Sequence, residues 1–373
     1  MIKTKPHYAI LDGLRGVAAL MVVWYHIFEG FATSPLDQKF NHGYLAVDFF
    51  YILSGFVIGY AYNDRWGQMS FWGFIKRRLI RLHPMVVFAA IAGAISFLIQ
   101  GSVQWDGTHI SLSQVLIGLT LTILLIPSFP GGAGEVRGNG EMFPLNGPSW
   151  SLFFEYIANI MYALFLRRLS TKVLRTVVIA SGIGYAAFAM LNGSGTYNMG
   201  VGWTMAGLNF IGGLTRVTFA FSCGLLISRN FKPIRVENAF WKCSAIIILL
   251  LSAPYIGIEA NWINSLYDTV CTTVIFPLLV LLGASESSKG VQSNKIFSLL
   301  GDISYPLYMI HYPIMYLFYA WLWKNGYPGD GGLNFSQAWP AAVAIFISMP
   351  VLAYICLRLY DIPVRKWLGR RLD

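Results

Sequence analysis

Charged residues are scarce in this chain of 373 residues, since only 12% are Asp, Glu, Lys or Arg. A soluble domain usually carries about 25%, so this scarcity, combined with 56% hydrophobic residues, argues against a soluble globular enzyme and excludes a disordered chain. Cysteine is also rare. The four cysteines lie far apart inside apolar runs without metal-ligand spacing, so we expect buried thiols and no metal site. The abundant aromatic residues (16%) are typical of membrane interfaces, and the composition predicts an all-α polytopic membrane protein.

Eleven apolar runs are candidates for membrane helices, which need about 20 residues each. They cover residues 9–31, 43–62, 84–100, 112–127, 150–166, 173–191, 205–228, 241–258, 265–284, 303–323 and 339–360. The basic residues form short clusters between these runs. We therefore interpret the net charge of +10 as a mark of cytoplasmic loops and expect no nucleic-acid partner.

Both ends of the chain are basic, at Lys3 and Lys5 and again between residues 365 and 371, which places both termini in the cytoplasm. An odd number of crossings is incompatible with that placement. The four basic segments between runs become cytoplasmic together only if run 112–127 does not cross; they are 63–83, 167–175, 229–242 and 285–296. We expect about ten transmembrane helices in a single domain (1–373), with 112–127 re-entrant or interfacial. The first run is too long for a signal-peptide core and should remain as the first span.

Ionisable side chains inside apolar runs cost about 2.5–3.5 kcal/mol each and therefore mark candidate functional sites. Arg15 and His26 are eleven residues apart in the first run, which on an α-helix returns to nearly the same face about 16 Å further along the axis. We expect both to face one cavity at different depths, with Asp12 near the cytoplasmic end. The alternatives are a snorkelling anchor for Arg15 and an interhelical hydrogen bond for His26.

Two carboxylates match His26 in depth, because Asp48 and Glu155 also lie about five residues from the outer ends of their runs. We expect one of them to accept a hydrogen bond from the imidazole and leave the other ring nitrogen as a general base. A structural polar network is the alternative. Arg216 and His311 lie in the middle of their runs. Each is either a counter-ion or a residue that makes a hydrogen bond between packed helices.

A basic cluster, including Arg77, Arg78 and Arg81, precedes the third run. It is either a plain topology marker or a phosphate site, since Arg78 and Arg81 are spaced to share one helix face. Phosphates on the cytoplasmic side suit a nucleotide-bearing carrier such as an acyl-coenzyme A. The sequence contains neither a P-loop nor a dinucleotide GxGxxG motif.

The segment Leu11-Asp12-Gly13-Leu14-Arg15-Gly16, followed by His26, resembles the first-helix signature of the acyltransferase-3 family of integral membrane acyltransferases. Later segments resemble further family motifs in the same order. They are Val47–Phe56 with Asp48 and Ser54, Arg78-x-x-Arg81, Trp150-Ser151-Leu152 with Glu155, Arg216 with Phe221 and Gly224, and Ile303–His311 with Tyr305. The resemblance covers the whole chain, and it adds Ser54, Trp150 and Tyr305 to the candidate pocket residues.

The resemblance implies an enzyme of the bacterial inner membrane, in contact with lipids, that takes an acyl group from cytoplasmic acyl-CoA. Acetyl-CoA is the simplest donor, and a hydroxyl of a carbohydrate such as a cell-surface polysaccharide is the implied acceptor. Carried onto this chain, Arg15 and His26 would be the catalytic pair, and Arg78 and Arg81 would contact the donor. The rival hypotheses are a transporter or flippase for a polar or glycosylated substrate, disfavoured because no internal repeat is found, and a non-catalytic lipid-binding protein.

Overall fold

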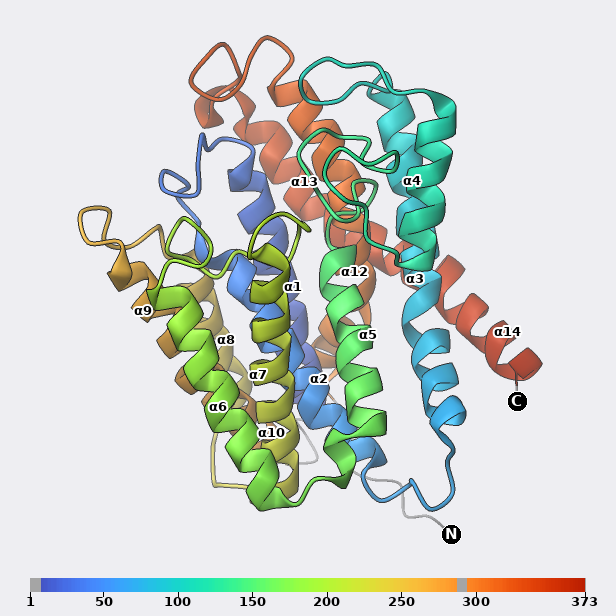
Figure 1. Cartoon of the computed structure of the whole chain (residues 1–373), viewed down its shortest axis with the longest axis vertical. Coiled ribbons are helices and arrows are strands. Elements are labelled where there is room, and N and C mark those ends of the chain that lie inside the picture. Colours follow the sequence, from blue (N-terminus) through green and yellow to red (C-terminus); the bar gives the residue numbers. More distant parts are fainter. Residues whose placement is uncertain (1–7, 287–293, 373) are drawn as a thin grey trace.

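The computed structural model describes residues 8–286 and 294–372, and this part of the chain is helical without a β-strand (Figure 1). The main α-helices are α1 (Ala9–Glu29), α2 (Ala46–Tyr62), α3 (Phe71–Ile99), α4 (Leu112–Leu124), α5 (Ser149–Leu164), α6 (Thr171–Met190), α7 (Asn209–Asn230), α8 (Ala239–Ser252), α9 (Trp262–Val270), α10 (Phe276–Ser285), α12 (Lys295–Leu322), α13 (Phe335–Cys356) and α14 (Ile362–Leu372). Short turns of helix at η1 (His42–Leu45), η2 (Leu166–Arg168), η3 (Cys271–Ile275) and η4 (Leu357–Asp361) precede, follow or join them. The predicted all-α class is confirmed.

Eight helical segments in the described part are long and apolar enough to cross a membrane. They are Ala9–Glu29, His42–Tyr62, Phe71–Ile99, Ser149–Arg168, Thr171–Met190, Asn209–Asn230, Trp262–Ser285 and Phe335–Arg371. These segments coincide with eight of the predicted crossings. The remaining two predictions fall on α8, which has only 14 residues, and on α12, which has 28 residues but carries two prolines and five tyrosines among them.

Most links between helices lie at one or the other end of the bundle (Figure 1). Links 63–70, 165–170 and 231–238, which belong to three of the basic segments, lie at the same end, the lower one in Figure 1. We call this the basic end and the opposite one the loop end. Residues 287–293 of the fourth basic segment, and Lys3 and Lys5, lie outside the described residues.

The run 112–127 forms the 13-residue helix α4, which packs beside the loop-end half of α3 (Figure 1). At 1.5 Å per residue it is about 20 Å long, less than the 30 Å of a bilayer core. A small hydrophobic cluster joins α3 and α4 to the irregular segment 125–148; its buried members are Ala94, Phe97, Ile110, Val115, Val136 and Leu145. This run is thus a short helix packed on a longer one.

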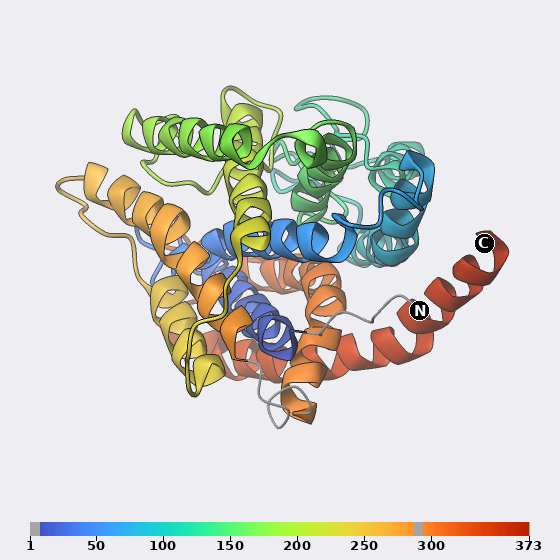
Figure 2. The ribbon, with the colours of Figure 1, turned by 90° about the horizontal axis from the view of Figure 1, so that it is seen from below.

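Helix α1 is central, because it packs against α2, α8, α10, α12 and α13, as the view from the basic end shows (Figure 2). Around it, α2 and α7 approach each other through glycines. A Cβ atom on Gly224 of α7 would lie 1.9 Å from the carbonyl oxygen of Ile52, and one on Gly55 would lie 2.1 Å from that of Phe221. The backbones of these two helices are therefore as close as they can be, and this contact fixes where α2 and α7 present their polar side chains. The four cysteines are free and buried, as predicted.

Replacing Gly224 by alanine tests this contact. A mid-helix Gly→Ala change normally stabilises by up to about 1 kcal/mol, but here the methyl group meets backbone atoms, and overpacking costs about 1–3 kcal/mol. We expect Gly224→Ala to lower the melting temperature of the purified protein. Gly184→Ala is the matched control, since no atom lies within 4 Å of its Cβ position in α6. Equal melting temperatures for the two variants would contradict the close contact.

Candidate functional site

Two cavities lie back to back along the bundle. The basic-end cavity has a volume of about 610 Å³ and is lined mainly by α1, α2, α3, α5 and α12. The loop-end cavity has a volume of about 490 Å³ and is lined by α1, η1, α12 and the loops of that end. Each is large enough for part of a sizeable ligand.

The basic-end cavity is rich in charge, with four arginines and three carboxylates in its wall: Arg15, Arg65, Arg78, Arg81, Asp12, Glu155 and Asp302. Glu155 accepts hydrogen bonds from the Arg78 guanidinium (2.7 Å) and from the Ser54 hydroxyl (2.8 Å). The Arg15 guanidinium donates to Ser304 Oγ (2.8 Å) and to the Gly301 carbonyl (3.0 Å), and it lies 3.7 Å from Asp12. Arg15 is thus fixed between α1 and α12.

The predicted phosphate pair is only partly available. Arg78 is 8% exposed and is neutralised by Glu155, whereas Arg81 is exposed and makes no hydrogen bond or ion pair with the residues that the structure describes. Arg77 points to neither cavity, since it lines neither. Tyr305 lines the basic-end cavity and donates from its hydroxyl to the Leu82 carbonyl (2.5 Å). Arg81 is therefore the exposed cation in this wall that is available to an anion.

The loop-end cavity is aromatic, with seven tyrosines and four tryptophans in its wall; the tryptophans are Trp105, Trp150, Trp203 and Trp323. His26 lies in this wall and its Nδ1 is 2.7 Å from Glu29 Oε2. Tyr319 donates to the same carboxylate oxygen (3.0 Å) and to the His26 carbonyl (2.6 Å). Because the carboxylate accepts the Nδ1 proton, the lone pair of the neutral ring is on Nε2.

The geometry corrects two expectations about His26. Arg15 and His26 line different cavities, and Val47 and Tyr308 are the residues that line both. The expected cluster of His26 with Asp48 and Glu155 is not formed either. Glu29, three residues further along the same helix, is the carboxylate bound to His26, and such i, i+3 neighbours share a helix face.

Asp48 is bound elsewhere, in a fully buried ion pair with Arg216. The Arg216 guanidinium donates to both Asp48 oxygens (2.7–3.2 Å) and to the carbonyls of Tyr44 (2.7 Å) and Val201 (2.9 Å). Its central carbon also lies 5.2 Å from the centroid of the Trp150 ring. Arg216 reaches the wall of the loop-end cavity, so the pair forms part of the floor of that cavity.

His311 is buried behind His26, and the two ring centroids are 5.3 Å apart. Its Nδ1 donates to the Leu307 carbonyl (3.2 Å), whereas its Nε2 has no hydrogen-bond partner among the described residues. His311 lines neither cavity. His311 therefore packs beside His26 but does not contact a ligand in either cavity.

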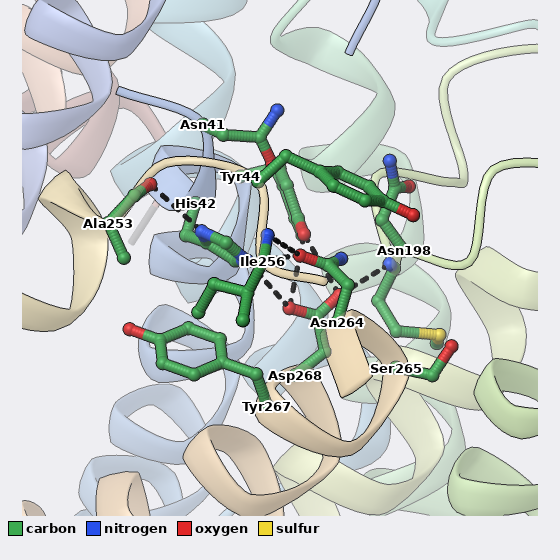
Figure 3. A network of polar contacts seen from close by, with 12 residues as sticks. Asn41, His42, Tyr44, Asn198, Ala253, Ile256, Asn264, Ser265, Tyr267 and Asp268 are labelled. Carbon is green, nitrogen blue, oxygen red and sulfur yellow. Dashed lines mark hydrogen bonds and ion pairs between the residues drawn. The ribbon is translucent and has the colours of Figure 1, made fainter. Parts of the chain in front are cut away.

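A second polar network holds the loop end together (Figure 3). His42 is hydrogen-bonded to the Ala253 carbonyl and to the Asn264 side chain (2.9 Å each). Asp268 accepts from the Tyr44 hydroxyl (2.9 Å) and from the Met199 backbone amide (2.7 Å). The network joins η1 and α9 to the loops 191–208 and 253–261. The sequence interpretation missed it, although Asp268 is an ionisable residue inside an apolar run and could have been found by that signal.

The segment 125–148 contributes a buried acid to the loop-end cavity. Glu141 accepts hydrogen bonds from the Tyr316 hydroxyl and from the Asn139 amide (2.8 Å). Arg137 of the same segment is fully buried, with its guanidinium carbon 3.3 Å from the Tyr316 ring centroid and its Nη1 donating to Gln100 Oε1 (2.7 Å). No local sequence pattern marks either residue, because both lie in an irregular segment whose partners are distant in the chain.

Among the described residues, no group of three or more His, Cys, Asp or Glu could hold a metal ion.

Comparison with known proteins gives a family match along most of the chain. The family model described as "Acyltransferase domain" matches residues 8–358. Acyltransferase MdmB of Streptomyces mycarofaciens is 25% identical over 97% of this chain and 92% of its own length. "Protein 2 in picA locus" of Rhizobium radiobacter is 33% identical over 47% of this chain and 91% of its own length. O-acetyltransferase OatA of Staphylococcus aureus is 23% identical over 95% of this chain, which spans only 57% of that longer relative. No solved structure matches the chain significantly.

Glu141 makes the stability of the loop end depend on pH. Burial raises the pKa of Glu141 from 4.5 to about 7, so the folded protein holds this proton more tightly than the unfolded chain does. The stabilisation is complete below pH 4.5 and is lost as the pH rises to about 7, at about 1.4 kcal/mol per pH unit. We expect the melting temperature of the wild type to fall relative to that of Glu141→Gln between pH 5 and 7 and to stay level above. Parallel curves for the two proteins would contradict this assignment.

Proposed function

Since the chain belongs to the acyltransferase-3 family of integral membrane acyltransferases, we propose that it moves an acyl group from acyl-CoA at the basic end to a hydroxyl of a carbohydrate acceptor at the loop end. The enzyme is a transferase embedded in a membrane, as its family and its apolar helices show. The observation that carries the proposal is the pair of cavities, one with arginines in its wall and the other with the His26–Glu29 pair.

The donor side follows from charge. Three basic links lie at the basic end, and basic loops are retained on the cytoplasmic side of a membrane, so this end faces the cytoplasm of a bacterial inner membrane. The basic residues near both ends of the sequence favour the same side for the two termini. Coenzyme A brings its phosphates from that side. Arg81 is the exposed cation in the cavity wall that would bind them, with Arg78 one turn away on the same helix. The narrow pantetheine arm then extends along the apolar wall formed by α2 towards Arg15.

The chemistry follows from the state of the His26 ring. Glu29 holds the proton on Nδ1, so Nε2 can accept the proton of an acceptor hydroxyl. As that proton leaves, the hydroxyl oxygen forms a bond to the thioester carbonyl carbon. The carbon–sulfur bond then breaks, and the proton held by His26 goes to the leaving thiolate, so that an ester and free coenzyme A are the products. General-base catalysis of this kind is worth about 10²–10⁴-fold in rate.

The acceptor side is supported by the aromatic lining. Sugar rings have apolar C–H faces that pack against aromatic rings, and their hydroxyls need polar partners such as Glu141, Asn139 and Gln38, which line the same cavity. The Staphylococcus aureus relative carries the name O-acetyltransferase, which supports an acetyl group as the cargo and an oxygen as its acceptor.

A transporter of a polar or glycosylated substrate is the second candidate, because two cavities that open towards opposite ends also suit alternating access. The two functions differ in one product. An acyltransferase releases free coenzyme A from acyl-CoA, whereas a transporter moves its substrate and leaves the thioester intact.

Replacing His26 by alanine tests the proposal. Purified protein in lipid vesicles is given acetyl-CoA and methyl glycosides of common hexoses, and both free thiol and acetylated glycoside are measured. We expect His26→Ala to lower the rate by about 10²–10⁴-fold at an unchanged melting temperature. His109→Ala is the matched control, because His109 is exposed and lines neither cavity. Normal transfer by His26→Ala would contradict the role of His26 as the general base. Movement of the glycoside without thiol release would favour the transporter.

A further inference from the structure

The two cavities meet at a partition made of two side chains. Among the described residues, Val47 of α2 and Tyr308 of α12 alone line both cavities. Both are nearly buried, at 5% and 6% exposure. These two residues therefore mark a place where the two cavities adjoin.

The tyrosine of this partition is held in place from several sides. Its hydroxyl lies 2.7 Å from Ser151 Oγ. Ser151 Oγ also lies 2.9 Å from the Pro148 carbonyl, to which only the serine can donate, so the Tyr308 hydroxyl is the donor to Ser151. Tyr51 donates to the Ser151 carbonyl (2.9 Å), and the Phe50 ring lies edge-on to Tyr308, with 5.6 Å between the centroids. The position of the ring is thus fixed by α2 and α5 together.

The reaction requires a small object to pass this place. The thioester sulfur reaches the partition from the basic-end cavity, and the acceptor oxygen approaches from the side of His26. Reacting atoms must come within about 3–3.5 Å of each other, so the acyl carbonyl and the carbons attached to it must lie against Val47 and Tyr308 during transfer. Each additional carbon would have to displace Val47 or Tyr308 from a close-packed site.

We propose that Val47 and Tyr308 determine the length of the acyl group that this enzyme transfers, by leaving room for a short chain and excluding longer ones. This inference rests on the proposed function and deepens it. Val47 sets the available volume, because it lines both cavities at the place where they adjoin. Tyr308 sets the rigidity of the opposite wall, because its hydrogen bond to Ser151 keeps the ring from turning aside.

The test compares acetyl-, propionyl-, butyryl- and hexanoyl-CoA as donors for the full-length protein in lipid vesicles, with kcat/KM measured for each. We expect the wild type to prefer the shortest donors. Val47→Ala removes the two methyl groups, and a pocket discriminates about tenfold or more per methylene. The butyryl-to-acetyl ratio of kcat/KM should therefore rise at least about tenfold in Val47→Ala, and by a smaller factor in Tyr308→Phe, which keeps the ring but loses its hydrogen bond.

Matched controls separate this effect from general loosening of the protein. Val351→Ala and Tyr354→Phe make the same chemical changes at exposed positions of α13 that line neither cavity, and both should keep the wild-type ratio. A wild type that uses hexanoyl-CoA as well as acetyl-CoA, or an unchanged ratio in both partition variants, would overturn the inference while the proposed function stands. Failure of the wild type to release thiol from any donor would instead overturn the proposed function.

Discussion

The buried ion pair between Arg216 and Asp48 is the interaction on which the arrangement of the loop end depends. Burying a guanidinium is costly, and it is tolerated here because Asp48 and the carbonyls of Tyr44 and Val201 together satisfy it. These partners come from α2, η1 and the loop before α7, so one side chain fixes three segments relative to α7. Removing one partner of such a pair typically costs about 3–5 kcal/mol. Tyr44 extends the constraint, because its hydroxyl is bound to Asp268 in the second network. The floor of the loop-end cavity is therefore rigid.

The rigid floor of the loop-end cavity helps to keep the two cavities separate. Helix α1 contributes Arg15 to one cavity and His26 to the other, and Val47 and Tyr308 separate them. In the proposed reaction, a charged donor and a polyhydroxylated acceptor would therefore be bound in chemically different surroundings, arginines on one side and aromatic rings on the other. The bilayer provides the reason for this arrangement. A donor confined to one aqueous phase and an acceptor confined to the other can meet only inside the protein, at a depth where irregular backbone and polar side chains must be satisfied internally.

The sequence predicted the all-α class of fold because that class depends on local patterns, and the catalytic role that it predicts for His26 also rests on a local pattern. Apolar runs, basic links and the Arg15–His26 spacing can all be read within one or two helices.

The partners of the buried charges could not be predicted in that way. Depth alone suggested that Asp48 and Glu155 would meet His26, yet each carboxylate pairs with an arginine on another helix, Arg216 and Arg78. Depth fixes one coordinate, whereas pairing also depends on which faces the helices turn towards each other, and glycine contacts such as Gly224 on Ile52 decide that.

Glu29 could have been predicted as the partner of His26, since it is the i+3 neighbour of His26. The positions of Glu141 and the partition residue Tyr308 could not have been predicted, because they depend on tertiary packing alone.

The central claim is that acyl-CoA enters from the basic end and that its acyl group leaves at the loop end. Sealed vesicles with the protein in one known orientation, read from protease cleavage of the link between α12 and α13, test this most directly, because coenzyme A thioesters do not cross a bilayer unaided. Radiolabelled acetyl-CoA is supplied to one face at a time, with methyl glycosides present on both. We expect thiol release only when acetyl-CoA is on the basic-end face, and labelled glycoside only on the opposite face. Equal turnover from either face, or labelled glycoside on the same face as the donor, would contradict it.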